Sequence, residues 1–401
     1  MNIKIKPCTL SGRIQAPPSK SYAHRLLICA ALADGKSTVH GISESEDMCA
    51  TLDCVSALGV KADRIGKSVT VHAGNRALTG NEFSCRESGS TLRFFIPIAL
   101  ACGNEAVFTG TKRLMERGVG IYETLFGEKG IEIEKTDESI RFRGRLTPGS
   151  YALRGDVSSQ FVSGLLFALP LLEDDSVIKV LPPVESRRYI DITIDAMRFF
   201  GVEVSETEEN TFSVRGRQSY RAREAFVEGD WSNAAALYGF NALGGSLTIE
   251  GLNESSIQGD RACIEIINKL NYEGAVIDLS DCPDLGPVMF ALAAAKNGAV
   301  FTGTRRLRIK ESDRAQAMAD ELKKFGINVI VEENSVTIEK SPLRAPTELL
   351  DSHNDHRIVM AMTLLASLTG GEISGAEAIR KSYPDFFRVL EKAGLETEHG
   401  I

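Results

Sequence analysis

The chain contains the stretch Phe108-Thr-Gly-Thr-Lys-Arg-Leu114 and repeats it, with one substitution, as Phe301-Thr-Gly-Thr-Arg-Arg-Leu307. The two copies lie 193 positions apart in a chain of 401 residues, close to half its length. Each is followed by an amphipathic stretch that ends in a glycine and an isoleucine, at Gly130-Ile131 and at Gly326-Ile327. A repeat with so long a period indicates a duplicated fold. Such a fold has a seam between its halves, and clefts between domains are favoured binding sites.

Shorter signals indicate further repeats within each half. Amphipathic runs end at Gly59, Gly201 and Gly394, and a glycine with positive φ commonly ends a helix. After each heptapeptide repeat we expect one charged, alternating strand, over residues 132–142 and 328–339. The chain thus divides into about six strand–helix–strand units, three in each half. The alternative, generic α/β punctuation, leaves the repeated heptapeptide unexplained.

Composition and charge exclude several classes of protein. The apolar fraction is 43%, which is ordinary for a globular protein, and no apolar run is long enough to span a membrane. The N-terminus lacks a signal-peptide core, and the eight cysteines form no Cys-x-x-Cys pair, as is typical of reduced thiols in the cytoplasm. The net charge of −8 argues against nucleic acid as a partner. We therefore expect a cytoplasmic protein without a membrane partner.

Cationic residues nevertheless stand at the starts of expected helices. Lys20 and Arg25 lie in the first turns of a helix that continues through the apolar residues 26–32, with Ser19 or Ser21 as its N-cap. The N-terminus of a helix carries partial positive charge, so cations there are unfavourable unless an anion lies in front of them. Backbone N–H groups at the same helix end would bind that anion as well.

The same arrangement occurs at four further helix starts. They are Glu87-Ser-Gly-Ser-Thr-Leu-Arg93, Asp156-Val-Ser-Ser-Gln160, Lys310-Glu-Ser-Asp-Arg314 and Asn354-Asp-His-Arg357. In the first of them we expect Ser90 to cap the helix and Gly89 to let a ligand approach the backbone. One such segment alone would be a solvated cap with an incidental arginine. Five of them in a chain of negative net charge predict a site for substrates with several anionic groups, such as phosphate and carboxylate.

The sequence contains no Walker loop, no Rossmann glycine fingerprint and no metal-ligand spacing. His353, Asp355 and His356 could suggest a metal, but they belong to a capping segment, and we expect neither a metal nor a cofactor. Any chemistry must then use acid–base groups beside the cations. The candidate carboxylates are Glu311, Asp313 and Asp284, and the candidate partners in proton transfer are Lys20, Lys310 and His356.

Four motifs are highly specific in combination. The chain carries, in this order, Pro-Pro-Ser-Lys-Ser-Tyr-Ala-His-Arg (17–25), Glu-Ser-Gly-Ser-Thr-Leu-Arg (87–93), Lys-Glu-Ser-Asp-Arg (310–314) and Asn-Asp-His-Arg (354–357). In these motifs it resembles the 5-enolpyruvylshikimate-3-phosphate (EPSP) synthases, which are enolpyruvyl transferases of aromatic amino-acid biosynthesis. The resemblance runs from Pro17 to Asp385, nearly the whole chain.

The resemblance implies an α/β fold of two similar inside-out domains, each built from three βαβαββ repeats with helices inside and sheets outside. Helix N-termini of both domains would face an interdomain cleft that holds the active site. The chain would cross between the domains twice. We expect residues 14–226 to form the first domain and residues 1–13 and 227–401 to form the second. The protein is expected to be a monomer.

The implied reaction joins shikimate 3-phosphate to phosphoenolpyruvate and releases phosphate. The 5-hydroxyl attacks C2 of phosphoenolpyruvate while the methylene carbon is protonated, and the tetrahedral adduct then loses a methyl proton and phosphate. The resemblance makes Asp284 the base for the hydroxyl and Glu311 the acid at the methylene, with Lys20 close to both steps. Cations around Glu311 oppose its protonation, so burial has to offset them.

The resemblance also assigns binding residues. Shikimate 3-phosphate is expected to bind Lys20, Ser21, Arg25, Ser158, Ser159, Gln160, Ser186, Tyr189, Asp284 and Lys310. Phosphoenolpyruvate is expected to bind Lys20, Gly89, Arg117, Gln160, Arg314, Arg357 and Lys381. Arginine forks suit its carboxylate, and mixed Lys and Arg suit its phosphate. Because Gly89 is small, it leaves room for glyphosate, and inhibition in competition with phosphoenolpyruvate is predicted.

The chain departs from the family's pattern at Arg306 and Glu87, where many members have Asn, and Arg306 is left out of the expected site. Two alternative functions stay open. A sister enzyme that transfers enolpyruvate to UDP-N-acetylglucosamine typically has a reactive cysteine in a mobile loop that corresponds to residues 112–117, and this segment has none. A non-catalytic binder of phosphorylated carboxylates would explain the cations, but not the retained Asp284 and Glu311.

Overall fold

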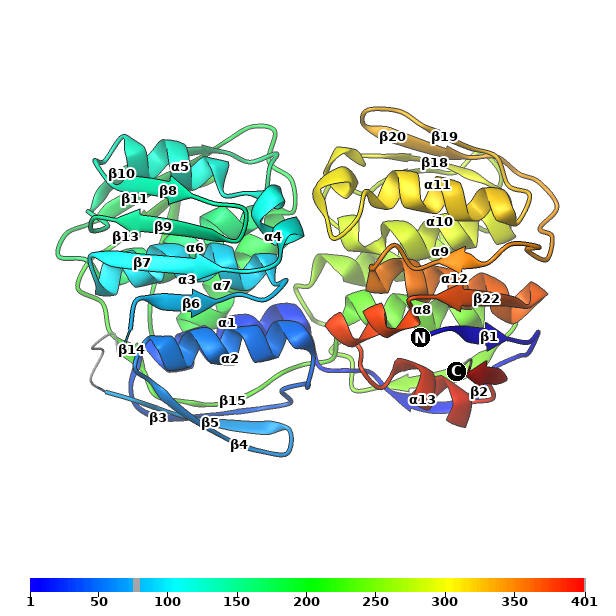
Figure 1. Ribbon diagram of the computed structural model, residues 1–401, viewed down its shortest axis with the longest axis horizontal. Coiled ribbons are helices and arrows are strands. Elements are labelled where there is room, and N and C mark those ends of the chain that lie inside the picture. The colour runs from blue at the N-terminus through cyan, green and yellow to red at the C-terminus, as the bar shows by residue number, and fades with distance from the viewer. Residues whose placement is uncertain (75–79, 400–401) are drawn as a thin grey trace. The chain divides into compact units, whose positions relative to one another are not determined.

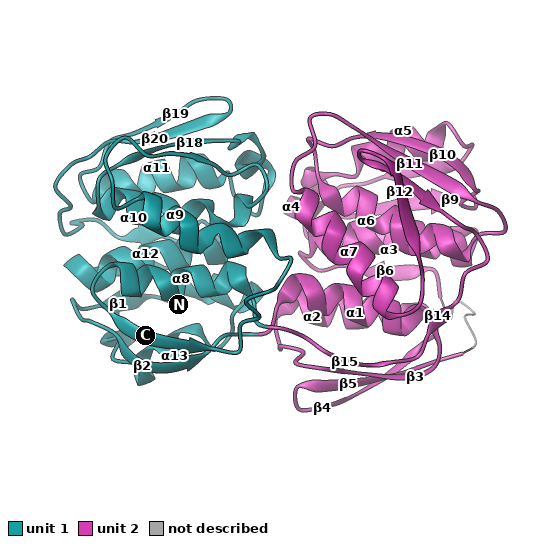
Figure 2. Cartoon of the chain, turned by 180° about the vertical axis from the view of Figure 1, so that it is seen from behind, with its two compact units in different colours: residues 1–17, 229–401 teal, residues 18–228 magenta. Residues whose placement is uncertain are grey.

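The structure is a computed structural model that describes residues 1–74 and 80–399. It divides the chain into two compact units, coloured separately in Figure 2. Unit 1 comprises Met1–Pro17 and Gly229–Ile401, and unit 2 comprises Pro18–Glu228. Each unit has its own buried apolar core. Among the described residues, no helix is long and apolar enough to span a membrane.

Three sheets contain the described strands of unit 2. Their strands are β3 (Ala33–His40), β4 (Lys61–Ile65), β5 (Ser68–Ala73), β6 (Glu82–Ser84), β7 (Glu105–Thr109), β8 (Glu132–Lys135), β9 (Ser139–Arg143), β10 (Gly149–Arg154), β11 (Ser176–Leu181), β12 (Val204–Glu208), β13 (Thr211–Val214), β14 (Tyr220–Arg221) and β15 (Glu224–Phe226). Two sheets, β6-β7-β9-β8 and β10-β11-β13-β12, share one pattern of a parallel pair followed by antiparallel pairs. The third sheet, β14-β3-β5-β4, repeats this pattern, and β15 also pairs with β3. The two parallel partners of β3, namely β14 and β15, come from the end of the unit.

The helices of unit 2 lie between these sheets (Figure 1). They are α1 (Lys20–Leu32), α2 (Glu46–Ala57), α3 (Gly89–Cys102), α4 (Lys112–Arg117), α5 (Gly120–Gly127), α6 (Ser159–Ala168) and α7 (Arg187–Phe199), with a short 3-10 helix η1 (Leu169–Leu171). In α3 and α6 nearly every residue is buried, and the two helices pack against each other. A helix that is apolar all round belongs in the centre of a domain, which explains why the helices lie inside.

Unit 1 repeats this plan. Its strands are β1 (Ile3–Ile5), β2 (Ser11–Gln15), β16 (Ser246–Glu250), β17 (Val276–Asp278), β18 (Ala299–Thr302), β19 (Val329–Val331), β20 (Ser335–Ile338), β21 (Leu350–Asp351), β22 (Gly371–Ser374) and β23 (Thr397–His399). The sheet β17-β18-β20-β19 has the same strand order and directions as β6-β7-β9-β8. In β21-β22-β1-β23 the N-terminal strand β1 lies antiparallel between two strands from the C-terminal end. The strands β2 and β16 form a parallel pair.

The helices of unit 1 alternate with its strands along the chain. They are α8 (Trp231–Ala242), α9 (Cys263–Lys269), α10 (Gly286–Ala295), α11 (Arg314–Lys324), α12 (His356–Thr369) and α13 (Phe386–Lys392), with the 3-10 helices η2 (Gly259–Ala262), η3 (Pro283–Leu285), η4 (Arg305–Ile309) and η5 (Ala376–Lys381). Nearly every residue of α10 and α12 is buried. The repeated strand–helix elements of the two units confirm the α/β fold class predicted from the sequence.

The predicted helix ends are confirmed, but two predicted strands are wrong. The helix-ending glycines have positive φ, namely Gly59, Gly130, Gly201, Gly326 and Gly394. Residues 132–142 and 328–339 each form two antiparallel strands, β8 with β9 and β19 with β20. In both turns a backbone N–H donates across the turn at 2.9 Å, from Thr136 to Ser139 O and from Glu332 to Ser335 O. The alternation of polar and apolar residues continues through these turns, so the sequence pattern did not indicate them.

Each copy of the heptapeptide ends a buried strand and starts a short helix. Phe108 on β7 and Phe301 on β18 are fully buried. A Cβ added at Gly110 would lie 2.8 Å from a backbone oxygen, and one at Gly303 (φ +69) would lie 2.6 Å from a backbone nitrogen. Both turns therefore require glycine, which accounts for its place in the repeat. The first copy leads into α4, so residues 112–117, expected to correspond to a loop, form a helix instead.

We predict that Gly164→Ala destabilises unit 2. A Cβ at Gly164 on α6 would lie 2.3 Å from Arg93 O and 2.3 Å from the Tyr122 hydroxyl oxygen, which already donates to that carbonyl at 2.8 Å. Forcing the helices apart should lower the free energy of unfolding by about 1–3 kcal/mol, measured by urea denaturation. The control is Gly127→Ala at the end of α5, where a Cβ would meet nothing within 4 Å. Equal stability of the two variants would contradict the prediction.

Candidate active site

The starts of five helices with largely buried residues are fixed by polar caps. Each cap accepts a hydrogen bond from a backbone N–H in the first turn, a group that otherwise has no partner within the helix. The caps are Ser19 (α1), Ser88 (α3), Ser158 (α6), Asp230 (α8) and Asp355 (α12). The expected cap of α3 at Ser90 is wrong, because Ser90 lies one step inside the helix, where its hydroxyl accepts a hydrogen bond from Gln160 Nε2 at 2.8 Å.

Lys20 is the first residue of α1 and has an acidic partner. Its Nζ lies 2.8 Å from Asp47 Oδ2, and the two side chains are 17% and 13% exposed. Asp47 lies in the first turn of α2, where a carboxylate also stabilises the helix. The protein therefore supplies part of the negative charge that the position of Lys20 requires, in addition to any anionic ligand.

Arg25 joins α1 to α7. Its Nε donates to Thr193 Oγ1 at 2.7 Å, its Nη1 to Ser21 O at 2.8 Å and its Nη2 to Tyr189 O at 3.0 Å. The guanidinium also lies over the Phe94 ring, 5.1 Å from its centroid. Burial lowers the pKa of Arg25 to about 10, so the group is charged at neutral pH. Arg25 thus brings together three residues that were expected to bind the same substrate.

Gly89 lies at the start of α3 against two arginines. A Cβ at Gly89 would lie 3.0 Å from Arg117 Nη2 and 3.0 Å from Arg93 Nη1. Arg93 Nη1 donates to Gln160 Oε1 at 2.6 Å, and Gln160 Nε2 donates to Ser90 Oγ at 2.8 Å. The structure therefore brings Gly89, Arg117 and Gln160 together. Two guanidinium groups beside the N–H groups of a helix start are suited to bind an anion.

The remaining expected residues of unit 2 lie at the starts of α6 and α7. Ser158 caps α6 with its Oγ, which accepts from Gln160 N at 3.3 Å, and Ser159 is 5% exposed. Ser186 precedes α7 with a left-handed φ of 55°. The residue before Ser186 donates its N–H to Gly155 O at 3.2 Å, so the two helix starts belong to neighbouring segments. Their hydroxyls are suited to a phosphate group.

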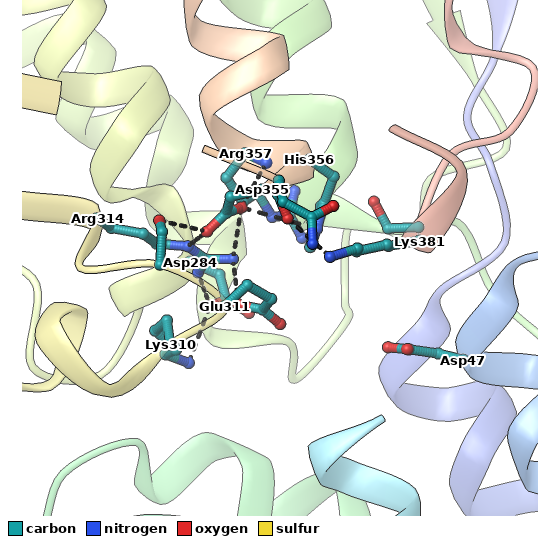
Figure 3. A network of polar contacts seen from close by, with 12 residues as sticks. Asp47, Asp284, Lys310, Glu311, Arg314, Asp355, His356, Arg357 and Lys381 are labelled. Carbon is teal, nitrogen blue, oxygen red and sulfur yellow. Dashed lines mark hydrogen bonds and ion pairs between the residues drawn. The ribbon is translucent and has the colours of Figure 1, made fainter. Parts of the chain in front are cut away.

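Arg314, the first residue of α11, is the centre of a network in unit 1 (Figure 3). Its side chain is 1% exposed and contacts three carboxylates. The Nε and Nη2 atoms donate to the two oxygens of Asp355, at 2.8 and 3.2 Å. Nη1 donates to Asp284 Oδ1 at 2.8 Å, and Nη2 donates to Glu311 Oε2 at 2.8 Å. A buried charge needs such partners to offset its loss of hydration.

Lys310 contacts the same oxygen of Asp284 from another direction, at 3.0 Å. Burial alone would raise the pKa of Asp284, but the charges of Lys310, Arg314 and Arg357 outweigh burial and hold this pKa well below its usual range. Burial lowers the pKa of Lys310, and the attraction of Asp284 opposes that change. The result is an ionised carboxylate between cations, which can accept a hydrogen bond from a substrate hydroxyl.

Arg357 and Lys381 join this network through one turn of the chain. Arg357, in the first turn of α12, donates its backbone N–H to Asp355 Oδ1 at 2.9 Å and its Nη1 to Asn233 Oδ1 at 3.0 Å. Lys381, the last residue of η5, donates its Nζ to Asn354 O at 2.7 Å. The six residues of unit 1 expected from the sequence therefore lie in one connected set of contacts, namely Asp284, Lys310, Glu311, Arg314, Arg357 and Lys381.

A family model described as EPSP synthase (3-phosphoshikimate 1-carboxyvinyltransferase) matches residues 5–276 and 267–390. The chain belongs to the EPSP synthase family. Its relatives include the 3-phosphoshikimate 1-carboxyvinyltransferases of Clostridium kluyveri, 39% identical over 99% of this chain and 98% of the relative, and of Clostridium novyi, 38% identical over 98% and 97%. The resemblance inferred from four motifs is confirmed, as is the enzyme class that it implied.

Solved EPSP synthases share the fold over the full length. The enzyme from Acinetobacter baumannii has a TM-score of 0.81 and 26% identity, and the match covers 99% of each chain. The enolpyruvyl transferase NikO from Streptomyces tendae has a TM-score of 0.79 and covers 100% of this chain and 98% of its own, but its identity of 15% shows the fold alone.

Several residues of the site were missed by the sequence analysis. Arg93 and Asp355 both lie within quoted motifs, and their position at helix starts was the available signal. Asp47 gave no signal, because it pairs with a lysine 27 positions away. Of the two carboxylates in the 310–314 motif, Asp313 caps α11 by accepting from the backbone N–H of Gln316 at 3.1 Å, which leaves Glu311 as the acid–base candidate.

Arg306, where many EPSP synthases have Asn, lies on η4 and is 5% exposed. Its charge contributes to the lowered pKa of Lys310, after burial. The departure therefore adds a buried cation next to a residue of the site rather than an inert surface change.

We predict that Asp284→Asn lowers stability in a pH-dependent manner. The pKa of Asp284 is depressed in the folded chain, so its contribution is full above the unfolded-state value of about 4 and declines as the pH falls further. Removing the charge should lower the free energy of unfolding by about 2–4 kcal/mol at pH 7, and the deficit should shrink toward pH 3. Thermal or urea denaturation at both pH values measures this difference.

The control is Glu265→Gln, which removes the carboxylate of an exposed ion pair with Lys269 (2.7 Å) in the same unit. It should leave stability nearly unchanged at both pH values, because exposed pairs contribute little. A deficit of Asp284→Asn that is the same at pH 7 and pH 3 would contradict the assignment.

Proposed function

We propose that this protein transfers the enolpyruvyl (1-carboxyvinyl) group of phosphoenolpyruvate to the 5-hydroxyl of shikimate 3-phosphate and releases inorganic phosphate. The observation that carries the proposal is the contact of Asp284 with Lys310 (3.0 Å) and Arg314 (2.8 Å), with Glu311 on the same arginine. The names of relatives that are 39% and 38% identical over the full length support the substrate pair.

The reaction needs two proton transfers at different atoms. The 5-hydroxyl oxygen bonds to C2 of phosphoenolpyruvate, its proton leaves, and the methylene carbon gains a proton to become a methyl group. In the second half the methyl group loses a proton, the double bond re-forms, and the bond between C2 and the phosphate oxygen breaks. No oxidant or metal is needed for this balance of atoms and electrons. Two carboxylates in different protonation states are suited to such chemistry.

Asp284 is the group that receives the hydroxyl proton in this proposal. Its carboxylate is ionised at neutral pH, because Lys310 and Arg314 outweigh the effect of burial on its pKa. A carboxylate stabilised in this way is a weak base. When anionic groups of the substrate bind the same cations, they offset the positive charge and raise the basicity of Asp284. The same cations would stabilise negative charge that develops on the attacking oxygen.

Glu311 is the acid at the methylene carbon in this proposal. In the absence of substrate its contact with Arg314 (2.8 Å) favours the carboxylate form. Phosphoenolpyruvate carries a carboxylate and a phosphate, and these anions would offset the arginine and favour a protonated Glu311. Lys20, oriented by Asp47, would lie close to both proton transfers and supply positive charge.

Both units contribute binding residues to the proposal. For shikimate 3-phosphate, the serines at the starts of α6 and α7 would bind the phosphate, and Tyr189 and the residues joined by Arg25 would contact the ring; the set is Lys20, Ser21, Arg25, Ser158, Ser159, Gln160, Ser186, Tyr189, Asp284 and Lys310. For phosphoenolpyruvate, the guanidinium groups beside Gly89 and the cations of unit 1 would bind the two anionic groups; the set is Lys20, Gly89, Arg117, Gln160, Arg314, Arg357 and Lys381. Arginine pairs well with carboxylate and phosphate because its donors form a planar fork.

The first test is phosphate release with phosphoenolpyruvate and either shikimate 3-phosphate or UDP-N-acetylglucosamine, with single-substrate controls. We expect release only with the shikimate pair. Asp284→Ala and Glu311→Ala should each lower kcat by about 100-fold or more, since each removes one proton-transfer group.

Two outcomes would contradict the proposal. Release only with the nucleotide sugar would assign the chain to the sister reaction, the transfer of enolpyruvate to UDP-N-acetylglucosamine. The α4 segment has no cysteine, which argues against that reaction. No release, together with tight binding of shikimate 3-phosphate, would make the protein a binder of phosphorylated carboxylates.

We predict that glyphosate inhibits the enzyme in competition with phosphoenolpyruvate and that Gly89→Ala weakens this inhibition. The added Cβ would lie 3.0 Å from the guanidinium nitrogens of Arg117 and Arg93. Both are ends of flexible side chains, so the variant should fold while its arginines move. The inhibition constant should rise about tenfold or more, as for an added methyl group in a closed pocket.

The control for this prediction is Gly120→Ala at the start of α5, where a Cβ would meet nothing within 4 Å. It should leave the inhibition constant unchanged. Inhibition that does not depend on the concentration of phosphoenolpyruvate would count against a site beside Gly89.

We also propose that the enzyme acts as a monomer in the cytoplasm without a nucleic-acid partner. The net charge of −8 supports the last point, since a polyanion would be repelled. Light scattering at the concentration of the assay tests the monomer, and a stable dimer would contradict it.

A further inference from the structure

One buried amide contacts the two segments that carry Arg357 and Lys381. Asn233, in the first turn of α8, is fully buried. Its Oδ1 accepts hydrogen bonds from Arg357 Nη1 at 3.0 Å and from Ser382 Oγ at 3.4 Å, and Ser382 directly follows Lys381. We infer that Asn233 is a positioning residue, which holds Arg357 and Lys381 in the arrangement that binds the anionic groups of phosphoenolpyruvate. The inference rests on the proposed function of this site.

The contacts around Asn233 form a closed ring. From Asn233 the ring runs to Arg357 through the 3.0 Å hydrogen bond and back along the chain to Asn354. Asn354 O accepts from Lys381 Nζ at 2.7 Å, and the next residue, Ser382, returns to Asn233. A ring of this kind fixes both cations with respect to each other. If the acceptor on Asn233 were removed, the ring would open at the two bonds that meet there.

The backbone of Asn233 is itself held by the cap of α8. Its backbone N–H donates to Asp230 Oδ1 at 2.8 Å, which is the capping bond of α8. Nearby, the N–H of Trp231 donates to Gln258 Oε1 at 3.2 Å, and Gln258 Nε2 donates to Gly229 O at 2.9 Å. The side chain of Asn233 therefore starts from a fixed backbone, from which its Oδ1 reaches the guanidinium of Arg357. Precise placement of such groups matters because small displacements of a binding group weaken the interaction strongly.

The chemistry of the acceptor also supports a role in anion binding. Arg314 faces three carboxylates, so its positive charge is largely neutralised within the protein. The Nη1 atom of Arg357 instead contacts neutral groups, the amide oxygen of Asn233 and the sulfur of Met360 (3.8 Å). A neutral acceptor orients the guanidinium and leaves its charge available to a ligand. An aspartate in the same place would cancel that charge.

The test compares Asn233→Leu with Asn241→Leu. Leucine has the same heavy-atom branching as asparagine but no acceptor. Asn241 lies on the same helix, and its side chain also makes two hydrogen bonds, to the backbone N–H and O of Leu247 at 2.7 and 2.8 Å. The control therefore removes an equal number of bonds from α8 at a place away from the two cations.

We expect Asn233→Leu to raise the KM for phosphoenolpyruvate about tenfold or more, since it removes a hydrogen bond to a charged group. The KM for shikimate 3-phosphate should stay within about twofold of the wild type. Asn241→Leu should lower stability without changing either KM. A merely structural role for Asn233 would lower stability or the active fraction alone, and unchanged KM values would overturn the inference.

A second variant covers the case in which Asn233→Leu does not fold. Ser382→Ala removes the second hydrogen-bond donor to Asn233 and should raise the KM for phosphoenolpyruvate alone, by about two- to fivefold. An unchanged KM would overturn the inference. If the wild type released no phosphate, the proposed function would fail, and the inference would be decided by calorimetry. Wild-type binding of phosphoenolpyruvate that is weakened at least about tenfold in the variant would support it, and equal or absent binding would overturn it.

Discussion

The buried contact of Arg314 with three carboxylates is the constraint on which the site in unit 1 depends. It joins the start of α11 to the cap of α12 through Asp355 and to the segment before α10 through Asp284. The cations that contact Asp284, Glu311 and Asp355 are Arg314 and Lys310, and the charge of Arg357 also acts on Asp284. An anionic ligand adds negative charge to this set and favours protonation of one of its carboxylates. Ligand binding and proton uptake are thereby coupled.

The cations fall into two groups according to the acceptor that orients them, which is either a carboxylate or a neutral amide. The cations beside Asp284 are held by carboxylates, which neutralise part of their charge. Arg93 and Arg357 are instead oriented by the amides of Gln160 and Asn233, which leave their positive charge in place. Arginines of the second kind attract anions, whereas those of the first kind adjust the charge of a carboxylate. The chain thus uses the same side chain for two purposes and distinguishes them by the partner.

Much of the fold could be predicted because its signals are local. The neighbouring backbone comes so close to Gly110 and Gly303 that only glycine fits there. The heptapeptide is repeated because the same turn occurs in both units. The helix-ending glycines gave the other boundaries. The hairpins within residues 132–142 and 328–339 were missed, because polar residues occupy both the strands and the turn.

The site could be predicted only in part. The quoted motifs indicated an anion site because cations at helix starts are unfavourable without an anion, and the roles of single residues, which came from the resemblance, stay predictions. The contacts of Asp47 and Asn233 could not be predicted, since each joins distant segments: 27 positions separate Asp47 from Lys20, and 124 separate Asn233 from Arg357. Such pairings follow from packing, which no local pattern records.

The place of β1 has a consequence for the order in which the protein folds during its synthesis. The strand Ile3–Ile5 leaves the ribosome long before its partners, β22 (Gly371–Ser374) and β23 (Thr397–His399). Unit 2 is one continuous stretch, Pro18–Glu228, and has all its contacts within reach long before translation ends. Unit 2 can therefore fold while the ribosome is still working. The apolar side chains of Ile3 and Ile5 are buried only after these two late strands have been made, so an early strand is completed last.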